Sequence, residues 1–165
     1  LIYNDEFPNE SDNTEIVELY SDDNGATWSG RIRVNDDATN RSQFLPWASL
    51  DQTTGWLAAS WHDARMDAGD HTDGDTNGIR NDDAQFWAAV SKDGGVTWET
   101  NIRVSAGTSN EDQAQNGIDY GDYTGLSFHA GVFYPIWADN SNSTGDNPNG
   151  TLNQFDLYTA RVQVS

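Results

Sequence analysis

A loop rich in carboxylate and amide side chains lies between residues 66 and 83. Within it, residues 73–78 read D-G-D-T-N-G and match D-x-D-x-N-G, the opening half of an EF-hand-like calcium loop. Alternate side chains at this spacing point inward around a hard cation, and the glycine permits the turn. The twelfth position is Ala84 rather than glutamate, so a neighbouring aspartate must substitute. The sequence therefore predicts a calcium site with these candidate ligands: Asp70, Asp73, Asp75, Asn77 and Asp83. The alternative is a solvated acidic loop.

An eight-residue pattern, S-x-D-x-G-x-T-W, occurs twice, at Ser21–Trp28 and at Ser91–Trp98. The two copies are 70 residues apart, and the match continues at that offset into residues 32–34 and 102–104, both Ile-Arg-Val. In such a turn, the aspartate accepts hydrogen bonds from nearby backbone N–H groups and the glycine adopts a positive φ. The repeat predicts two equivalent hairpin turns between short β-strands.

A second repeated element is an aromatic residue followed two positions later by aspartate, at residues 3–5, 61–63 and 137–139. We expect each copy to end a strand. Glycines and Asn-Asp clusters interrupt the chain often, and no long stretch has helical periodicity, so the sequence predicts an all-β fold. Ten strands are expected, including these eight: 44–50, 123–128, 56–61, 132–137, 15–20, 85–90, 3–5 and 157–164.

The repeated turn resembles the Asp box of sialidases and related BNR-repeat β-propellers. This resemblance implies four-stranded antiparallel blades in a ring expected to have six of them. The chain then supplies about two and a half blades, the C-terminal portion of the ring. Residues 1–35 form a partial blade, 36–105 a full blade, and 106–165 a last blade that lacks its outer strand. The remaining blades would come from a longer chain or from an oligomer, because open sheet edges invite aggregation.

The resemblance also implies where a catalytic site would lie. In sialidases, a cluster of arginines binds the substrate carboxylate bidentately, and a separate aspartate acts as acid and base. Arg65, two residues after Asp63, is the candidate arginine, and Asp63 ends a strand on the face where such a site would form. The alternative is that Arg65 braces its own loop by pairing with Asp63 or Asp67. The family's N-terminal arginine motif has no match in this sequence.

The nucleophile of sialidases is a tyrosine paired with a glutamate, which departs from the usual pair of carboxylates. Tyr120 and Tyr123 lie near the start of an expected strand, and Glu111 lies in the loop before them. Tyr123 is the candidate that the resemblance suggests. The alternative is that these aromatic residues pack against strands.

The charge balance excludes several partners. The chain carries 27 acidic and 8 basic residues, for a formal charge of −19. Such a field repels nucleic-acid phosphates and anionic lipid surfaces. There is no uninterrupted apolar run of 18 residues, so no membrane span is expected. The absence of cysteine excludes disulfides and thiolate metal sites.

Two functions remain in competition. One is a structural or glycan-binding segment of a secreted sialidase-like propeller. Aromatic residues such as Trp47, Trp61 and Trp137 would stack on sugars there, and the alternative is that most of them belong to the core of the blades. The other is the catalytic portion of an exo-sialidase-type glycoside hydrolase, completed by missing or partner blades. The negative charge disfavours the second, because an anionic substrate needs a positive pocket. Both imply an extracellular or cell-surface location.

Overall fold

The structure is a computed structural model that describes residues 1–7, 13–69, 78–114, 120–141 and 154–165. The described residues form antiparallel β-sheets and one short 3-10 helix, η1 (Glu111–Gln113). The predicted all-β fold is confirmed. No helix in the described part of the chain is long and apolar enough to cross a membrane.

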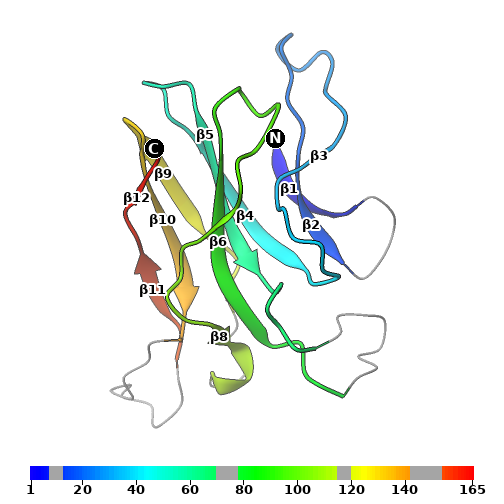
Figure 1. Cartoon of the computed structure of the whole chain (residues 1–165), viewed down its shortest axis with the longest axis vertical. Coiled ribbons are helices and arrows are strands. Elements are labelled where there is room, and N and C mark those ends of the chain that lie inside the picture. Colours follow the sequence, from blue (N-terminus) through cyan, green and yellow to red (C-terminus); the bar gives the residue numbers. More distant parts are fainter. Residues whose placement is uncertain (8–12, 70–77, 115–119, 142–153) are drawn as a thin grey trace.

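Three sheets lie side by side (Figure 1). The first contains β1 (Ile2–Glu6), β2 (Thr14–Glu18) and β3 (Ile32–Arg33), in that order. The middle sheet contains β4 (Gln43–Leu50), β5 (Leu57–Asp63), β6 (Asp83–Ser91) and β7 (Ile102–Arg103), with β8 (Ser109–Asn110) also paired to β6. The third contains β9 (Gly125–His129), β10 (Val132–Asp139), β11 (Asp156–Thr159) and β12 (Val162–Gln163).

In the first sheet, and from β4 to β7 of the middle sheet, consecutive strands are neighbours. In the third sheet, β9 pairs with one edge of β10, while β11 and β12 follow each other along the opposite edge. The expected strands are present in the expected order, except that the strand expected over 157–164 is divided into β11 and β12. The two-residue strand β8 and helix η1 are additions that the sequence does not predict.

The middle sheet buries both of its faces. Successive residues of a strand point to opposite faces. On one face, Ala59, Trp61 and Ala89 pack against residues of the first sheet and its following loop, Ile16 and Val34. On the other face, a second core forms with the third sheet from these residues: Ala58, Ala88, Val90, Phe128 and Phe133. The small alanines allow the neighbouring sheets to approach closely.

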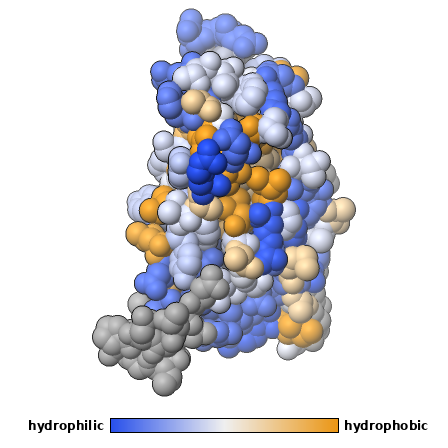
Figure 2. All heavy atoms as spheres, turned by 60° about the vertical axis from the view of Figure 1, so that its left-hand side comes forward, coloured by the Kyte–Doolittle hydropathy of each residue, from blue (hydrophilic) through white to orange (hydrophobic). Residues whose placement is uncertain are grey.

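The third sheet covers the middle sheet with only one of its faces. Along β10, Phe133 and Trp137 are buried, while Tyr134 and Ile136 between them are exposed. Figure 2 turns the side of the molecule that carries this sheet forward, and an apolar patch lies among polar residues there. Exposed apolar residues of the third sheet thus face outward, away from the described core.

The two repeated turns form the hydrogen bonds that their sequence predicts. In the first, at Ser21–Trp28, the Ser21 hydroxyl accepts the Gly25 N–H at 2.8 Å. Asp23 accepts the backbone N–H of Thr27 at 2.8 Å and its hydroxyl at 2.6 Å. The hydrogen bonds from Thr27 lower the pKa of Asp23 to about 2. The second turn, at Ser91–Trp98, repeats each of these contacts with equivalent residues: Ser91, Gly95, Asp93 and Thr97.

We call the end of the sheets that carries these turns the turn end, and the opposite end the loop end. The repeated turns lie in the upper part of Figure 1. Strand β5 starts at the turn end with Leu57 and finishes at the loop end with Asp63. The candidate sites that follow are therefore assigned to one end or the other.

Candidate functional site

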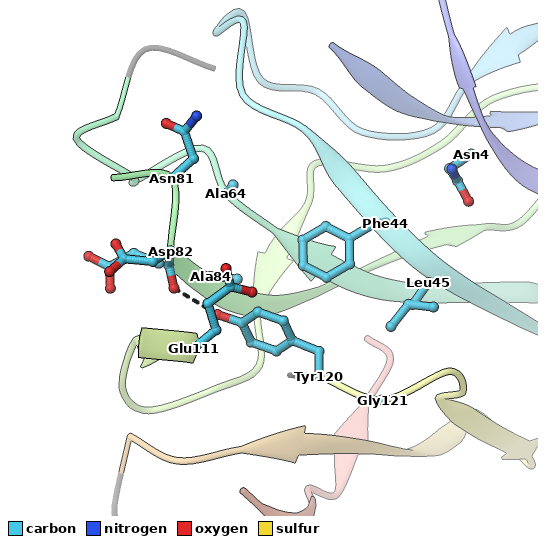
Figure 3. A pocket seen from close by; sticks show the side chains of 11 residues that line it. Asn4, Phe44, Leu45, Ala64, Asn81, Asp82, Ala84, Glu111, Tyr120 and Gly121 are labelled. Atoms are coloured by element: carbon cyan, nitrogen blue, oxygen red, sulfur yellow. Dashed lines mark hydrogen bonds between the residues drawn. The ribbon is translucent and has the colours of Figure 1, made fainter. Parts of the chain in front are cut away.

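A cavity of about 350 Å³ opens at the loop end (Figure 3). Several segments form its wall: the start of β4, the residue after β5, the segment that leads into β6, helix η1 and the segment before β9. Strand β1 adds one residue. Its lining residues are Asn4, Phe44, Leu45, Ala64, Asn81, Asp82, Asp83, Ala84, Glu111, Tyr120 and Gly121. Segments far apart in the sequence thus meet here.

Three carboxylates make the cavity strongly acidic: Asp82, Asp83 and Glu111. Burial raises the pKa of Asp82, and the negative charges of Asp83, Asp112 and Asp67 raise it further, against a hydrogen bond from Asn110. No arginine or lysine lines this cavity among the described residues. An anionic ligand would meet repulsion here, whereas hydroxyl or ammonium donors would meet acceptors.

Tyr120 forms an aromatic wall of the cavity and is buried. Its hydroxyl lies 3.2 Å from the carbonyl oxygen of Asp82 and 3.1 Å from that of Ser109, so it can donate to either. Burial raises the pKa of this phenol, and the nearby charge of Glu111 adds to the shift. A nucleophile must lose its proton, so this environment opposes a nucleophilic role for Tyr120.

Tyr123, the candidate nucleophile suggested by the resemblance, is 81% exposed. It follows Gly121 closely in sequence but does not line the cavity. No hydrogen bond or charged neighbour in the described structure activates its hydroxyl. Of the two tyrosines, Tyr120 therefore has the packing role that the alternative interpretation expected, and Tyr123 is a solvated side chain.

Arg65 is held by its neighbours within the molecule. Its NH2 group lies 2.8 Å from Asp63 Oδ2 and 3.0 Å from Asn101 Oδ1, and its NH1 group lies 3.0 Å from Asp36 Oδ1. The guanidinium also stacks on Trp87, 3.9 Å from the ring centroid. Few of its donors remain for a substrate carboxylate. These contacts support the alternative in which Arg65 braces its loop.

Asp63 is fully buried, and both of its carboxylate oxygens are engaged. Oδ2 accepts the indole N–H of Trp61 at 2.8 Å, and Oδ1 accepts the backbone N–H of Arg65 at 2.8 Å. Trp137 and Asp139 repeat the indole contact at 3.0 Å. Residues i and i+2 share a face of a strand, so the aromatic-x-Asp element closes the strand end by itself. Its role here is structural.

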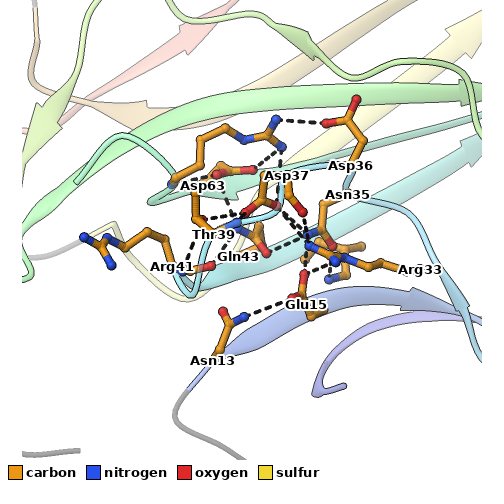
Figure 4. Close-up of polar contacts among 12 residues, drawn as sticks. Asn13, Glu15, Arg33, Asn35, Asp36, Asp37, Thr39, Arg41, Gln43 and Asp63 are labelled. Atoms are coloured by element: carbon orange, nitrogen blue, oxygen red, sulfur yellow. Dashed lines mark hydrogen bonds and ion pairs between the residues drawn. The ribbon is translucent and has the colours of Figure 1, made fainter. Parts of the chain in front are cut away.

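A buried polar network extends from Asp63 into the first sheet (Figure 4). Arg33 lies 2.9 Å from Glu15 Oε2 and 3.3 Å from Asp37 Oδ1. Asn35 donates to Glu15 and also to Gln43 Oε1, the latter at 2.8 Å. Burial raises the pKa of Glu15, although Asn35 and Arg33 lower it. The network joins the first sheet to the middle one.

Four of the five predicted calcium ligands lie outside the described residues: Asp70, Asp73, Asp75 and Asn77. The fifth, Asp83, begins β6, where its carboxylate accepts Asn110 Nδ2 at 2.7 Å and its N–H donates to Asp67 Oδ2 at 2.8 Å. Within the described ranges, no group of three or more carboxylate, imidazole or thiolate side chains is arranged to hold a metal ion. The calcium site therefore stays a prediction.

Sequence analysis did not find most of the cavity. Phe44 and Leu45 were assigned to an ordinary strand, yet β4 contains a bulge between Phe44 and Trp47, and Leu45 has a φ of 53°. In the sequence, Pro46 is the residue that indicates this bulge, because proline inside a strand marks a bulge or an edge. The bulge turns this part of β4 toward the cavity.

Comparison with models of known protein families found no match for this chain, and a search of curated proteins found none either. The fold and the site define a class of protein, namely an all-β protein of antiparallel sheets with an acidic cavity at one end.

Proposed function

We propose that this chain is part of a sialidase-like β-propeller and that it binds a glycan in the acidic cavity at the loop end. The cavity is the observation that carries the proposal. It combines aromatic walls from Phe44 and Tyr120 with hydrogen-bonding groups from Asp82, Asp83 and Glu111. Sugars present both apolar C–H faces and hydroxyl donors, so such a lining is complementary to them.

The arrangement of the sheets supports the propeller assignment. The middle sheet is a meander of four consecutive strands followed by β8, and β4 lies against β1 on one side and β9 on the other. The expected blade boundaries at 1–35, 36–105 and 106–165 assign each strand to its own sheet except β8, which follows residue 105 and yet pairs with β6. The outward apolar face of the third sheet, with Tyr134 and Ile136, is where a further blade would pack. That blade would come from a longer chain or a second copy.

We propose that the ligand is a neutral glycan and that the protein is secreted or lies at the cell surface. Titration calorimetry with a neutral hexasaccharide such as cellohexaose, and with sialyllactose, tests this. We expect saturable heat with the neutral sugar only. Asp82→Asn and Glu111→Gln should each weaken binding about tenfold, and Asp156→Asn, an exposed aspartate of β11, should not. Tight sialyllactose binding, or full affinity in both cavity variants, would refute the proposal.

Glycoside hydrolysis is the second candidate function, and the raised pKa of Asp82 favours it, because a general acid must hold its proton. A sialidase reaction is disfavoured, since Arg65 is engaged with Asp63 and Tyr120 donates to carbonyl groups. We expect no hydrolysis of a fluorogenic sialoside by the 165-residue chain. Hydrolysis that disappears in Asp82→Asn would instead establish the enzymatic function.

We also propose that calcium binds the loop that contains Asp73 and Asp75 and orders the neighbourhood of Asp83. Binding to the folded state would stabilise it by roughly 2.7 kcal/mol at a hundredfold excess of calcium over the dissociation constant. Calcium titration calorimetry in moderate salt is the test, with the double variant Asp73→Ala, Asp75→Ala as control. No saturable heat at millimolar calcium, or equal stabilisation by sodium at matched ionic strength, would show that the loop is only a solvated acidic surface.

A further inference from the structure

A second hollow, of about 490 Å³, opens at the turn end of the molecule. It lies between the first repeated turn and the middle sheet, and the second repeated turn adds Gly94 and Trp98 to its wall. Leu57, the first residue of β5, lines this hollow, whereas Ala64, just after β5, lines the acidic cavity. The two cavities are therefore at opposite ends of the same strand, roughly 20 Å apart at the rise of a β-strand.

The hollow has an aromatic platform. Trp28 of the first repeated turn lines it and is 51% exposed. Its counterpart Trp98 is only partly exposed, packs against the core, and donates its indole N–H to Glu18 Oε2 at 2.7 Å. The turn itself closes through its serine, aspartate and threonine hydrogen bonds, so the exposure of Trp28 is not needed to build it. An exposed indole face beside a hollow is available for a ligand.

The hollow also holds a fixed hydrogen-bond acceptor. The Glu18 carboxylate is buried, and its Oε2 atom accepts the hydrogen bond from the indole N–H of Trp98. Its Oε1 atom lies so close to Gly95 that a Cβ there would be 2.2 Å away. Gly95, which has no Cβ, thus leaves the space that the carboxylate occupies, and the Trp98 hydrogen bond holds the carboxylate there. Asn24, at the tip of the first turn, adds an exposed amide beside it.

We propose that this hollow is a second sugar-binding site, in which one ring of a neutral saccharide stacks on Trp28 and donates a hydroxyl to Glu18. Its volume lies within the range of about 300–1,000 Å³ that is usual for small-molecule sites. The Glu18 carboxylate and the formal charge of −19 repel acidic sugars, so charge complementarity selects a neutral one. The site uses none of the residues of the acidic cavity and does not depend on the function proposed for that cavity.

The test is titration of the full 165-residue chain with cellohexaose, laminarihexaose and mannohexaose, by calorimetry and by tryptophan fluorescence. We expect at least one of these neutral saccharides to bind. Trp28→Ala should reduce the affinity of that saccharide for the hollow at the turn end at least tenfold, and Glu18→Gln should reduce the same affinity severalfold. The matched control is Trp47→Ala, because Trp47 is 46% exposed on β4 but does not line the hollow. Trp28→Phe, which keeps a ring, should retain part of the affinity if Trp28→Ala fails to fold.

The acidic cavity is tested separately in the same titrations, because Asp82→Asn and Glu111→Gln should leave binding at the turn end unchanged. The proposal is overturned if none of the three saccharides binds, or if folded Trp28→Ala binds as tightly as the parent chain. It is also overturned if Trp28→Ala converts a dimer into a monomer in sedimentation experiments, because a second copy would then be what covers Trp28.

Discussion

The two repeated units of this molecule, residues 14–37 and 84–107, have the same backbone plan and different interiors. At the turn end they coincide bond for bond, down to the serine, aspartate and threonine contacts. At the loop end the first unit carries a charged set, whereas the second has neutral residues at most of the equivalent positions. The charged set is Glu15, Arg33 and Asp37, joined by the neutral Asn35. The counterparts of these four residues, in chain order, are Gln85, Arg103, Ser105 and Gly107.

This difference teaches that a local motif fixes its own turn but not its surroundings. Arg33 pairs with Glu15 and Asp37, while the equivalent Arg103 donates to the carbonyl oxygens of Ser105 and Ala106 at 2.9 and 2.6 Å. Each arginine contacts groups of its own unit, so the replacement of Glu15 and Asp37 by Gln85 and Gly107 in the second unit decides which environment the arginine meets.

The largest effect should come from the arginine pair. Arg33→Met leaves the buried Glu15 without a cation and leaves Asp37 with only the longer contact to Arg65, at 3.9 Å, and we expect it to cost about 3 kcal/mol of unfolding free energy. Arg103→Met, the matched control, should cost about 1 kcal/mol or less, because exposed carbonyl groups regain water. Urea denaturation of both variants measures this. Equal losses would mean that the charged set does not distinguish the two units.

The next effect concerns pH at the loop end. His62 is buried among Phe44, Phe86 and Tyr120, and its Nε2 donates to the Ala138 carbonyl oxygen at 3.1 Å. Burial lowers its pKa from 6.5 to about 4. The unfolded chain therefore binds the proton first, so the stabilisation is complete above pH 6.5 and is lost as pH falls toward 4.

This loss amounts to on the order of 3 kcal/mol. In His62→Gln, the part of the acid destabilisation that falls between pH 6.5 and 4 should disappear. His129→Gln, at an exposed position in β9, is the control and should keep it. Denaturant titrations at several pH values measure this effect. If the unfolding free energy of His62→Gln depends on pH as steeply as that of the parent chain, the burial of a neutral imidazole is contradicted.

A smaller effect should separate the two turn glycines. Gly25 and Gly95 have φ values of 86° and 94°, so an alanine is strained at either, by about 1–2 kcal/mol. Only at Gly95 would the new Cβ also meet the Glu18 carboxylate. We expect Gly95→Ala to be more destabilising than Gly25→Ala in thermal unfolding. The reverse order would show that Glu18 moves aside freely.

The smallest difference should be between the turn aspartates. The threonine hydrogen bonds hold the pKa of both Asp23 and Asp93 at about 2, below the usual 3.8. Their contribution to stability is present above pH 3.8 and is lost as pH falls toward 2. Asp23→Ala and Asp93→Ala should lower the melting temperature at pH 7 by similar amounts. Clearly unequal shifts would mean that the turns are not equivalent.

The parts of this fold that could be predicted from sequence are those that nearby residues determine. The repeated turns, the order of the strands and the strand-ending role of Asp63 all depend on groups within a few residues of one another. Of the partners of Arg65, the nearby Asp63 could be predicted, but Asp36 and Asn101 could not, because they come from the first sheet's loop and from the segment before β7. The acidic cavity was missed for the same reason, since it joins Asn4 to Tyr120.

The ties between sheets have a consequence for folding kinetics. Within each sheet, the paired strands come from one continuous part of the chain, but the sheets are joined by groups that are more distant in sequence. Asp51 accepts the N–H of Gly131, 80 positions away, and Trp98 reaches Glu18 across the same separation. Closing loops of that length is slow, so we expect each sheet to form early and the sheets to dock on one another late. Substitutions at Asp51 or Glu18 should therefore accelerate unfolding while leaving the refolding rate almost unchanged.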